Sequence, residues 1–534
     1  MTDTTFLSLP EDLHINIMAE MDARSLIRCA MTCKDLYETL RSSVVLEYRL
    51  QLYFDGLEDS GTSTSSISSR ISDLRSYRQA WFRQEWRVLP DTLGFSSRYH
   101  NFDSYKVGGG VVSVKGGEYF QVVWLPNSRT GAGHAIEHKF SSRNRDVEFC
   151  TDPTQDAIAI LEDGFWETEL EFDVPGGQES YFRINIHIRT LTTNANHPLA
   201  NKGILTFLDQ SCNHYDKTIH NPKFEFSHDT LVLWTGDYVP RLLIWNWKTG
   251  QLLEDFRFDI RTPRSICMVI PTDVDDFGLL GSSDFAFLTR PVGFGTIEIY
   301  KLKPSIHLAT LHLPSYAQGI TVESLIIRSH SNPIHAYKDP RGPFTVNAEE
   351  QIYVFEVLYE YPESDMGLQQ FSMTISVHQR IFMEYCAYDT VKRKPAVNVP
   401  WDVWGPSNSA VDTSFIRIWG SRPSHGQRVL CFPNSSLSTN HIEIRDFTLG
   451  AVLAASGAEL PFHLGRERPA GVLVRSNTIS IADVPLFAED VVGKLPYVSY
   501  SLMLKRRDFD IIMLCEEGIV GIMFERTRVL ALTY

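Results

Sequence analysis

Apolar positions follow two different patterns along the 534-residue chain. Between Leu13 and Val45, apolar residues recur every three or four positions, which is the spacing of one face of a helix. From Pro90 onward, short runs rich in β-branched and aromatic residues alternate with turn residues, which is typical of strands. The pattern therefore predicts a small helical module followed by a large all-β region.

Three helices are expected in the first module. Ser8, Pro10 and Glu11 fit the start of the first helix, as a capping box with proline in the first turn, and Asp22 can cap the second. The apolar positions of the three helices are Leu13, Ile17, Met18 and Met21; Leu26, Ile27 and Ala30; and Leu36, Leu40, Val44 and Val45. A domain this small buries little apolar surface by itself, so a partner covering one face would stabilise it.

The β-rich region is too long for one sandwich or one small barrel, and its repeated strand–turn–strand form favours a propeller. "LLIWNWKTGQLL" at 242–253 predicts two strands joined by a polar turn that ends at Gly250, and residues 442–453 and 297–302 are weaker copies. No helical period stands out here. About seven irregular blades of about 63 residues are expected, longer than the ~40–45 residues of regular WD repeats. Six or eight blades also fit.

These patterns divide the chain into four predicted parts: a helical domain at 1–59, a flexible Ser/Thr-rich linker at 60–70, an amphipathic connecting helix at 71–90 and a propeller-like domain at 91–534. Phosphorylation of the linker is an alternative that the pattern does not require. The connecting helix has an aromatic stripe and several arginines. A nucleic-acid site would use such a mixture, but docking of the stripe on the next domain with solvated arginines explains it better.

Within residues 6–50, the pairs Leu9-Pro10, Met21-Asp22 and Cys33-Lys34, together with Ile17 and Leu26, stand at the spacing of the F-box motif. The segment therefore resembles an F-box domain, although Thr32 replaces a common valine and Leu36 a common aromatic residue. The alternative is a generic helical cap. The resemblance implies docking on a Skp-type adaptor and, through it, on a cullin–RING ubiquitin ligase. The family's adaptor-binding positions fall on Leu9, Pro10, Leu13, Ile17, Leu26 and Cys33.

The whole arrangement, with Trp245-Asn246 where WD-type blades have Trp-Asp, resembles the large F-box proteins of fungi. This likeness implies a non-catalytic receptor, whose first module binds the ligase and whose propeller at 91–534 binds a protein substrate. Two alternatives stay open. The chain could be an F-box scaffold that leads to no degradation, or a propeller hydrolase with an incidental F-box.

Composition narrows the partners and the compartment. The net charge of −15 opposes binding to a phosphate backbone, so nucleic acid is not expected as a partner. No apolar run approaches the ~20 residues needed to span a bilayer, and the start of the chain lacks the basic and apolar segments of a secretory signal. Eight scattered cysteines without a Cys-x-x-Cys pair indicate reduced thiols in the cytoplasm or nucleus.

Four short motifs suggest chemistry or processing, and each has a simpler explanation. His134 to His138 matches a zinc-protease pattern, but on a strand the two histidines would be ~13 Å apart, too far to share one ion. Residues 273–278 resemble a calcium loop with Phe277 at a ligand position, so a turn at a blade edge is expected instead. Residues 392–394 could be a nuclear import signal, but a solvated loop is more common. The glycosylation sequon from Asn434 to Ser436 matters only in a secreted protein. We therefore expect no catalytic residue, cofactor or metal site.

Overall fold

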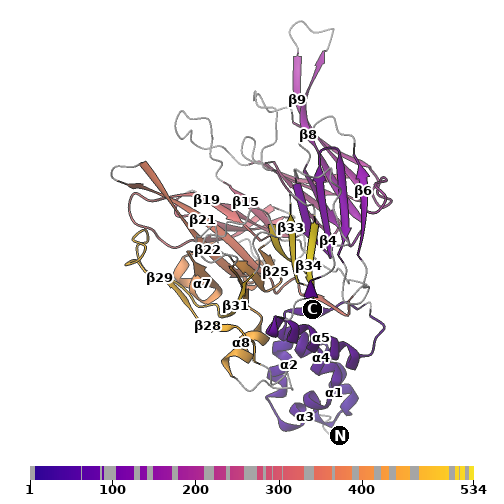
Figure 1. Cartoon of the computed structure of the whole chain (residues 1–534), viewed down its shortest axis with the longest axis vertical. Coiled ribbons are helices and arrows are strands. Elements are labelled where there is room, and N and C mark those ends of the chain that lie inside the picture. Colours follow the sequence, from indigo (N-terminus) through magenta and orange to yellow (C-terminus); the bar gives the residue numbers. More distant parts are fainter. Residues whose placement is uncertain are drawn as a thin grey trace, which may run out of the picture.

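The computed structural model shows a helical module at one end of the molecule and a ring of β-sheets that forms the rest (Figure 1). It describes residues 6–61, 63–84, 87–88, 104–125, 133–140, 148–170, 178–209, 222–235, 241–257, 274–280, 284–291, 293–302, 305–329, 342–363, 367–387, 396–413, 423–431, 441–457, 468–503, 511–515, 518–523 and 528–533. The segments 392–394 and Asn434 to Ser436 lie outside the described residues.

The helical module contains a short 3₁₀ turn, Phe6–Ser8, and the helices α1 (Glu11–Ala19), α2 (Ala23–Ala30), α3 (Lys34–Ser42) and α4 (Val44–Phe54). The expected third helix is divided at Ser43, whose extended backbone ends α3 and whose hydroxyl accepts a bond from Leu46 N at the start of α4. One apolar cluster holds the four helices together; its fully or nearly fully buried members are Met18, Leu26, Ala30, Leu36, Leu40, Leu46, Leu50 and Phe54.

The caps of these helices agree only in part with the caps predicted from the sequence. Asp22 caps α2 as predicted, because its carboxylate accepts bonds from the backbone N–H groups of Arg24 and Ser25. The capping box from Ser8 is wrong, because Pro10 is the N-cap of α1 and no side chain bonds there. The extended backbone of Pro10 alone sets the entry into α1.

Seven sheets follow one another along the chain. The first three are β3 (Ser104–Gly108), β4 (Val111–Gly116), β5 (Tyr119–Trp124) and β6 (His134–Lys139); β7 (Glu148–Asp152), β8 (Ala157–Leu170), β9 (Gln178–Thr190) and β10 (Ile204–Asp209); and β11 (Lys223–Ser227), β12 (Thr230–Trp234), β13 (Arg241–Asn246) and β14 (Gln251–Arg257). The fourth holds β15 (Asp276–Leu280), β16 (Phe285–Arg290), β17 (Thr296–Leu302) and β18 (Ser305–His312), with β23 (Val397–Val399) added in parallel to β18.

The last three sheets are less regular. The fifth holds β19 (Thr321–Ile327), β21 (Ile352–Glu363), β22 (Gly367–His378) and β24 (Ser409–Asp412); the sixth holds β25 (Ser424–His425), β26 (Arg428–Cys431), β27 (His441–Asp446), β31 (Tyr497–Met503) and β28 (Val472–Val474); and the seventh holds β32 (Ile511–Cys515), β33 (Gly518–Met523), β34 (Arg528–Thr533) and β2 (Arg87–Val88). Two small pairs stand apart: β1 (Leu57–Asp59) with β20 (Phe344–Val346), and β29 (Asn477–Ile479) with β30 (Val491–Gly493).

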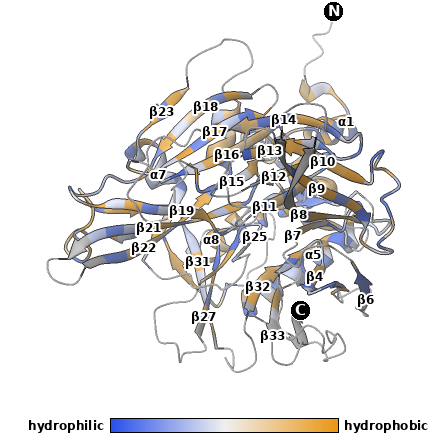
Figure 2. Cartoon of the chain, turned by 90° about the horizontal axis from the view of Figure 1, so that it is seen from above, coloured by the Kyte–Doolittle hydropathy of each residue, from blue (hydrophilic) through white to orange (hydrophobic). Residues whose placement is uncertain are grey.

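The seven sheets close into a ring, which the view in Figure 2 shows. Apolar clusters fill each junction between consecutive sheets, and one of them joins Val112 of the first sheet to Val520 of the seventh. Strand pairing also contributes to closure, because β2, which precedes the first sheet in the chain, pairs with β34 of the seventh sheet. The predicted propeller is confirmed, and its closing strand β2 precedes Pro90, ahead of the range 91–534 expected for this domain.

Two of the three predicted hairpins are present. Residues 242–253 form β13 and β14, joined by a turn in which Asn246 Oδ1 accepts from Thr249 N at 2.9 Å and Gly250 takes a φ of +75°. Residues 297–302 lie in β17, which pairs with β18. The copy at 442–453 is wrong: its first half is β27, but α8 (Leu449–Ser456) follows.

Helix α8 forms because Thr448 caps it, with its hydroxyl accepting from Ala451 N, and because Ala- and Leu-rich residues follow. Gly450 faces helix α4, where an added Cβ would lie 3.1 Å from the carbonyl oxygen of Phe54. Close approach of two helices, not a turn, therefore favours glycine at this position. Two further helices, α6 (Arg380–Cys386) and α7 (Trp401–Asn408), show that the expectation of no helix after Pro90 was wrong.

Deleting residues 518–534 is expected to leave protein that is insoluble or rapidly cleaved by protease. The deletion removes β33 and β34, so β2 and β32 lose their partners and two sheet edges open. The check is limited proteolysis of the soluble fraction. A truncated chain that stays soluble and protease-resistant would contradict closure of the ring.

Candidate functional site

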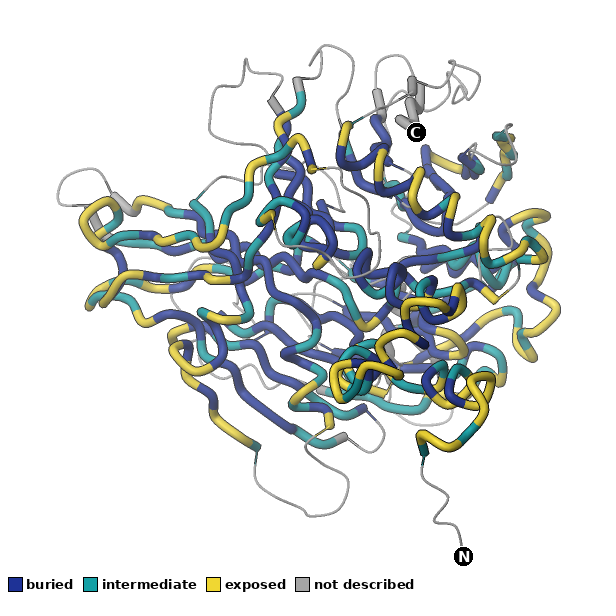
Figure 3. The backbone as a smooth tube through the Cα atoms, turned by 90° about the horizontal axis from the view of Figure 1, so that it is seen from below, coloured by how far each residue is buried: buried dark blue, intermediate teal, exposed yellow. Residues whose placement is uncertain are grey.

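An apolar surface on the helical module is the first candidate site. Leu13 and Ile17 stand four residues apart on α1, on one helix face, and their exposed fractions are 45% and 41%. Pro10 is exposed beside them, and Leu9 and Cys33 are half-buried. Seen from below in Figure 3, exposed stretches run along these helices near the N-terminus. Exposed apolar groups gathered in this way mark a protein-binding surface.

Leu26 is the one predicted adaptor-binding residue that the structure places in the interior. Its side chain is fully buried and packs in the apolar cluster of α1 to α4. It therefore supports the exposed surface from beneath and cannot line it. The five other predicted residues, Leu9, Pro10, Leu13, Ile17 and Cys33, are at least partly accessible.

Sequence reasoning missed several accessible apolar residues of the module: Leu7, Met31, Tyr37, Val44 and Val45. Met31 is the most exposed of them, at 79%. Val44 and Val45 had been assigned to a buried helical stripe. The break at Ser43 turns them outward, since they occupy the first turn of a new helix instead of the last turn of α3. Ser43 followed by a long apolar run was the available signal for that break.

A buried ion pair joins the helical module to α5 (Ile67–Arg83), the helix that packs on the ring. The guanidinium of Arg78 donates to both carboxylate oxygens of Asp55, from Nε to Oδ1 at 2.9 Å and from Nη2 to Oδ2 at 2.7 Å. Asp55 directly follows α4, and the side chains of both residues are 5% exposed or less. This pair holds α5 against the end of α4.

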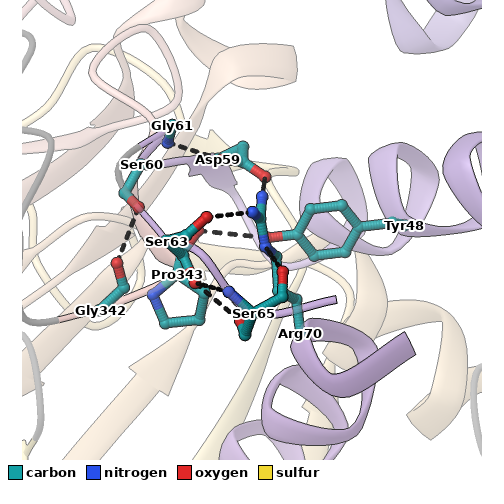
Figure 4. Close-up of polar contacts among 9 residues, drawn as sticks. All are labelled: Tyr48, Asp59, Ser60, Gly61, Ser63, Ser65, Arg70, Gly342 and Pro343. Atoms are coloured by element: carbon teal, nitrogen blue, oxygen red, sulfur yellow. Dashed lines mark hydrogen bonds and ion pairs between the residues drawn. The ribbon is translucent and has the colours of Figure 1, made fainter. Parts of the chain in front are cut away.

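A second set of contacts binds the segment after α4 to the ring (Figure 4). Strand β1 pairs with β20, which belongs to the connection between β19 and β21 of the fifth sheet. Tyr48 Oη donates to the carbonyl of Pro343 at 3.2 Å, and Ser60 N donates to the same carbonyl at 3.0 Å. Burial, followed by the negative charge of Asp59, raises the pKa of Tyr48 well above its ordinary value, so this phenol keeps its proton and remains a donor.

Arg70 orders the Ser/Thr-rich segment itself. Its guanidinium pairs with Asp59 at 2.7 Å and donates to the carbonyl oxygens of Ser63 and Ser65. Figure 4 shows these groups converging on one side chain. Helix α5 already begins at Ile67, inside the stretch 60–70 assigned to a flexible linker. The described part of this stretch is folded against its neighbours; the domain boundaries given above stay a prediction.

On its other side, α5 contacts the sixth sheet through Arg428 of β26. The guanidinium of Arg428 lies 4.1 Å from the ring centre of Trp81 and donates to Tyr77 Oη at 2.9 Å and to Asp446 at 3.0 Å. Burial by itself would lower the pKa of Arg428, but Asp446 and then Tyr77 raise it above its ordinary value. The aromatic stripe of α5 thus docks on the propeller, while Arg78, expected to be solvated, is buried.

The possible zinc motif does not form a ligand set. His134 to Lys139 is strand β6, as predicted, so the two histidines are spread along the strand. His138 Nε2 lies 2.9 Å from the carbonyl oxygen of Leu191, and His134 stacks on Trp124. Among the described residues, no group of three or more His, Cys, Asp or Glu side chains is placed to hold a metal ion.

Part of the possible calcium loop lies in a buried strand of the propeller. Asp273 lies outside the described residues. The expected turn at a blade edge is wrong, because Asp276 starts β15, the first strand of the fourth sheet. Asp275 accepts a bond from Leu325 N at 2.5 Å, and Asp276 accepts from Ile327 N and pairs with Lys223. These carboxylates join neighbouring strands instead of facing a common ion.

Purified protein is therefore expected to carry neither zinc nor calcium in stoichiometric amount, and to show no peptidase activity. Elemental analysis by mass spectrometry is the measurement, with the His138→Ala variant as its control. One zinc per chain that the variant loses would overturn this prediction.

The described helices include none that is long and apolar enough to cross a bilayer. Away from the helical module, the hairpin of β8 and β9 rises from the ring on the opposite side of the molecule (Figure 1).

Comparison with known proteins gives one family match. Residues 6–48 match the F-box domain. No curated protein matches the sequence. Solved structures similar in fold include the β-propeller domain of Myceliophteria thermophila Cps50 (Swd1), with 7% identity, 84% of this chain and 99% of that chain covered, and a TM-score of 0.35. A second is the C-terminal WD40 domain of Sif2, with 9% identity, 80% of this chain and 93% of that chain covered, and a TM-score of 0.33. A third is Saccharomyces cerevisiae Sqt1, with 10% identity, 65% of this chain and 80% of that chain covered, and a TM-score of 0.26.

The F-box match covers the exposed apolar surface of α1 and the start of α4. The propeller assignment rests on the strand pairing and on the seven apolar junctions described above. The likeness to fungal F-box proteins stays a prediction.

Proposed function

We propose that this F-box protein with a C-terminal propeller is the substrate-recognition subunit of a Skp–cullin–F-box ubiquitin ligase. The helical module binds the Skp-type adaptor through Leu9, Pro10, Leu13, Ile17 and Cys33, and the propeller binds a target protein. The observation that carries the proposal is the exposed pair Leu13 and Ile17 on an F-box domain that is docked on a closed ring. The compartment is the cytoplasm, the nucleus or both.

The mechanism is proximity and not side-chain chemistry. A bound target is held near the ubiquitin-conjugating enzyme, so its lysines experience a high effective concentration of activated ubiquitin. The contacts of Arg78, Tyr48 and Arg428 restrict the orientation of the propeller relative to the adaptor-binding surface. A restricted orientation keeps the target at a defined distance from the ligase.

Proteomics of the bound partners, with and without a proteasome inhibitor, tests this function. Wild-type protein is expected to co-purify with a Skp-type adaptor and a cullin, and its targets are expected to increase when the proteasome is inhibited. A Leu13→Lys, Ile17→Lys variant should retain the targets and lose the ligase. If the amounts of the targets do not change when the proteasome is inhibited, the protein is a scaffold that leads to no degradation. If no ligase subunit co-purifies with the wild-type protein, the proposal is contradicted.

A further inference from the structure

The outer edge of the second sheet has an unusual composition. Strand β10 pairs with β9 along one edge. Its Leu205 and Phe207 side chains are buried in the core between the second and third sheets. Its Ile204 and Leu208 side chains point to the other side and are 45% and 49% exposed. Two large aliphatic side chains are therefore accessible on a strand at the rim of the ring.

The backbone of the same residues faces outward. Gly203 O accepts a bond from Ile188 N of β9, so Gly203 belongs to the set whose backbone groups point towards β9. In an antiparallel ladder this set alternates along the strand. Ile204, Thr206 and Leu208 consequently direct their N–H and C=O groups towards the outer edge of the sheet, where no described strand pairs with β10. The residues with exposed side chains are also those with outward backbone groups.

Several other outer strands of the ring carry charges or a covering strand, and the uncharged edge strands β23 and β28 are only three residues long. Strand β6 contains Glu137 and Lys139, and β14 contains Glu254, Asp255 and Arg257. The outer strand of the fourth sheet is covered by β23. Natural edge strands are protected by charges or by covering segments of this kind. Strand β10 has no charged residue before Asp209.

We propose that β10 pairs with β10 of a second copy of this chain, antiparallel, about a two-fold axis at Thr206. The strand is complementary to itself in this register. Thr206 lies opposite Thr206 of the second copy. Ile204 of each copy lies opposite Leu208 of the other, so apolar side chains contact apolar side chains. All three pairs have outward backbone groups, so the contact forms about six backbone hydrogen bonds. The two second sheets become one continuous sheet across the dimer.

The mass of the full chain in solution tests the dimer. Sedimentation at micromolar concentration is expected to approach about 122 kDa, twice the 60.8 kDa of one chain. Ile204→Lys with Leu208→Lys places like charges opposite each other and should give a monomer, whereas Ile204→Lys with Leu208→Glu places opposite charges there and should restore the dimer. Both variants change only exposed side chains, and Val403→Lys, at a residue 63% exposed on α7, is the matched control.

Cysteine cross-linking tests the register. In the proposed pairing, the Cα atoms of the two Thr206 residues are about 5.5 Å apart, within the ~4.4–6.8 Å range of disulfides. The Cα atoms of the two Leu208 residues are about 14 Å apart, because Leu208 lies opposite Ile204 of the second copy, four residues away. Thr206→Cys should form a covalent dimer on oxidation, and Leu208→Cys should not. A wild-type chain that stays monomeric, because another segment or partner covers β10, overturns the proposal; so does equal cross-linking of the two variants.

Discussion

Replacing Leu13 and Ile17 with lysine is expected to abolish binding of the Skp-type adaptor. Both side chains are exposed on one face of α1, so the change leaves the buried cluster around Leu26 intact. Loss of a central apolar contact costs about 2–4 kcal/mol at a protein interface. That cost corresponds to about a 30- to 1000-fold loss of affinity. Calorimetric titration of the adaptor into each purified protein measures it.

The control for this experiment is Val403→Lys, which adds the same charge at an exposed valine on the propeller. It should bind the adaptor with wild-type affinity. The thermal melts of all three proteins should coincide, since no buried residue changes. Adaptor binding that survives the double substitution would show that α1 does not contact the adaptor, and the F-box surface described here would then be wrong.

Replacing Arg78 with methionine is expected to loosen the helical module from the propeller and to lower the free energy of unfolding by about 3–5 kcal/mol, because Asp55 would remain buried without its partner. Arg75→Met is the matched control. Arg75 lies on the same helix and also pairs with α4, through Glu47, but its side chain is 44% exposed. Exposed pairs contribute at most about 1 kcal/mol. Urea unfolding measures the free energy of unfolding of both variants, and limited proteolysis measures how firmly the helical module is held.

A second substitution separates the lost ion pair from other effects of Arg78→Met. Asp55→Asn removes the buried charge, so the double variant should recover part of the lost stability. If Arg78→Met costs no more than Arg75→Met, the pair does not stabilise the junction, and the contacts of β1 and Tyr48 with the ring hold the module without it.

Short-range patterns in the sequence identified the propeller but not its helices. The alternation around Trp245 and the turn at Gly250 are local features, and both were predicted correctly. Asp446 and Gly450 have the same spacing as Asn246 and Gly250, but the hairpin predicted there is wrong, because Thr448 caps a helix and Gly450 fits against α4. Such a contact joins residues far apart in the chain, and no local pattern shows it.

The candidate site was also predicted only in part. Apolar spacing showed that residues such as Leu13 and Leu26 belong to one helical module, but it could not separate the exposed from the buried members. That division depends on how α1 to α4 pack. The folded state of the Ser/Thr-rich segment depends on Arg70 and on the carbonyl of Pro343, which is nearly 300 positions away from Tyr48 and reachable only in the folded chain.

Hydrogen exchange of the full chain, alone and mixed with the Skp-type adaptor, tests the central claim most directly. The account predicts a stable complex in which amides of Glu11–Ala19 and of the residues around Cys33 exchange more slowly, while the propeller strands are unchanged. A mixture that forms no complex, or a complex whose protection falls on the propeller and spares α1, would contradict it.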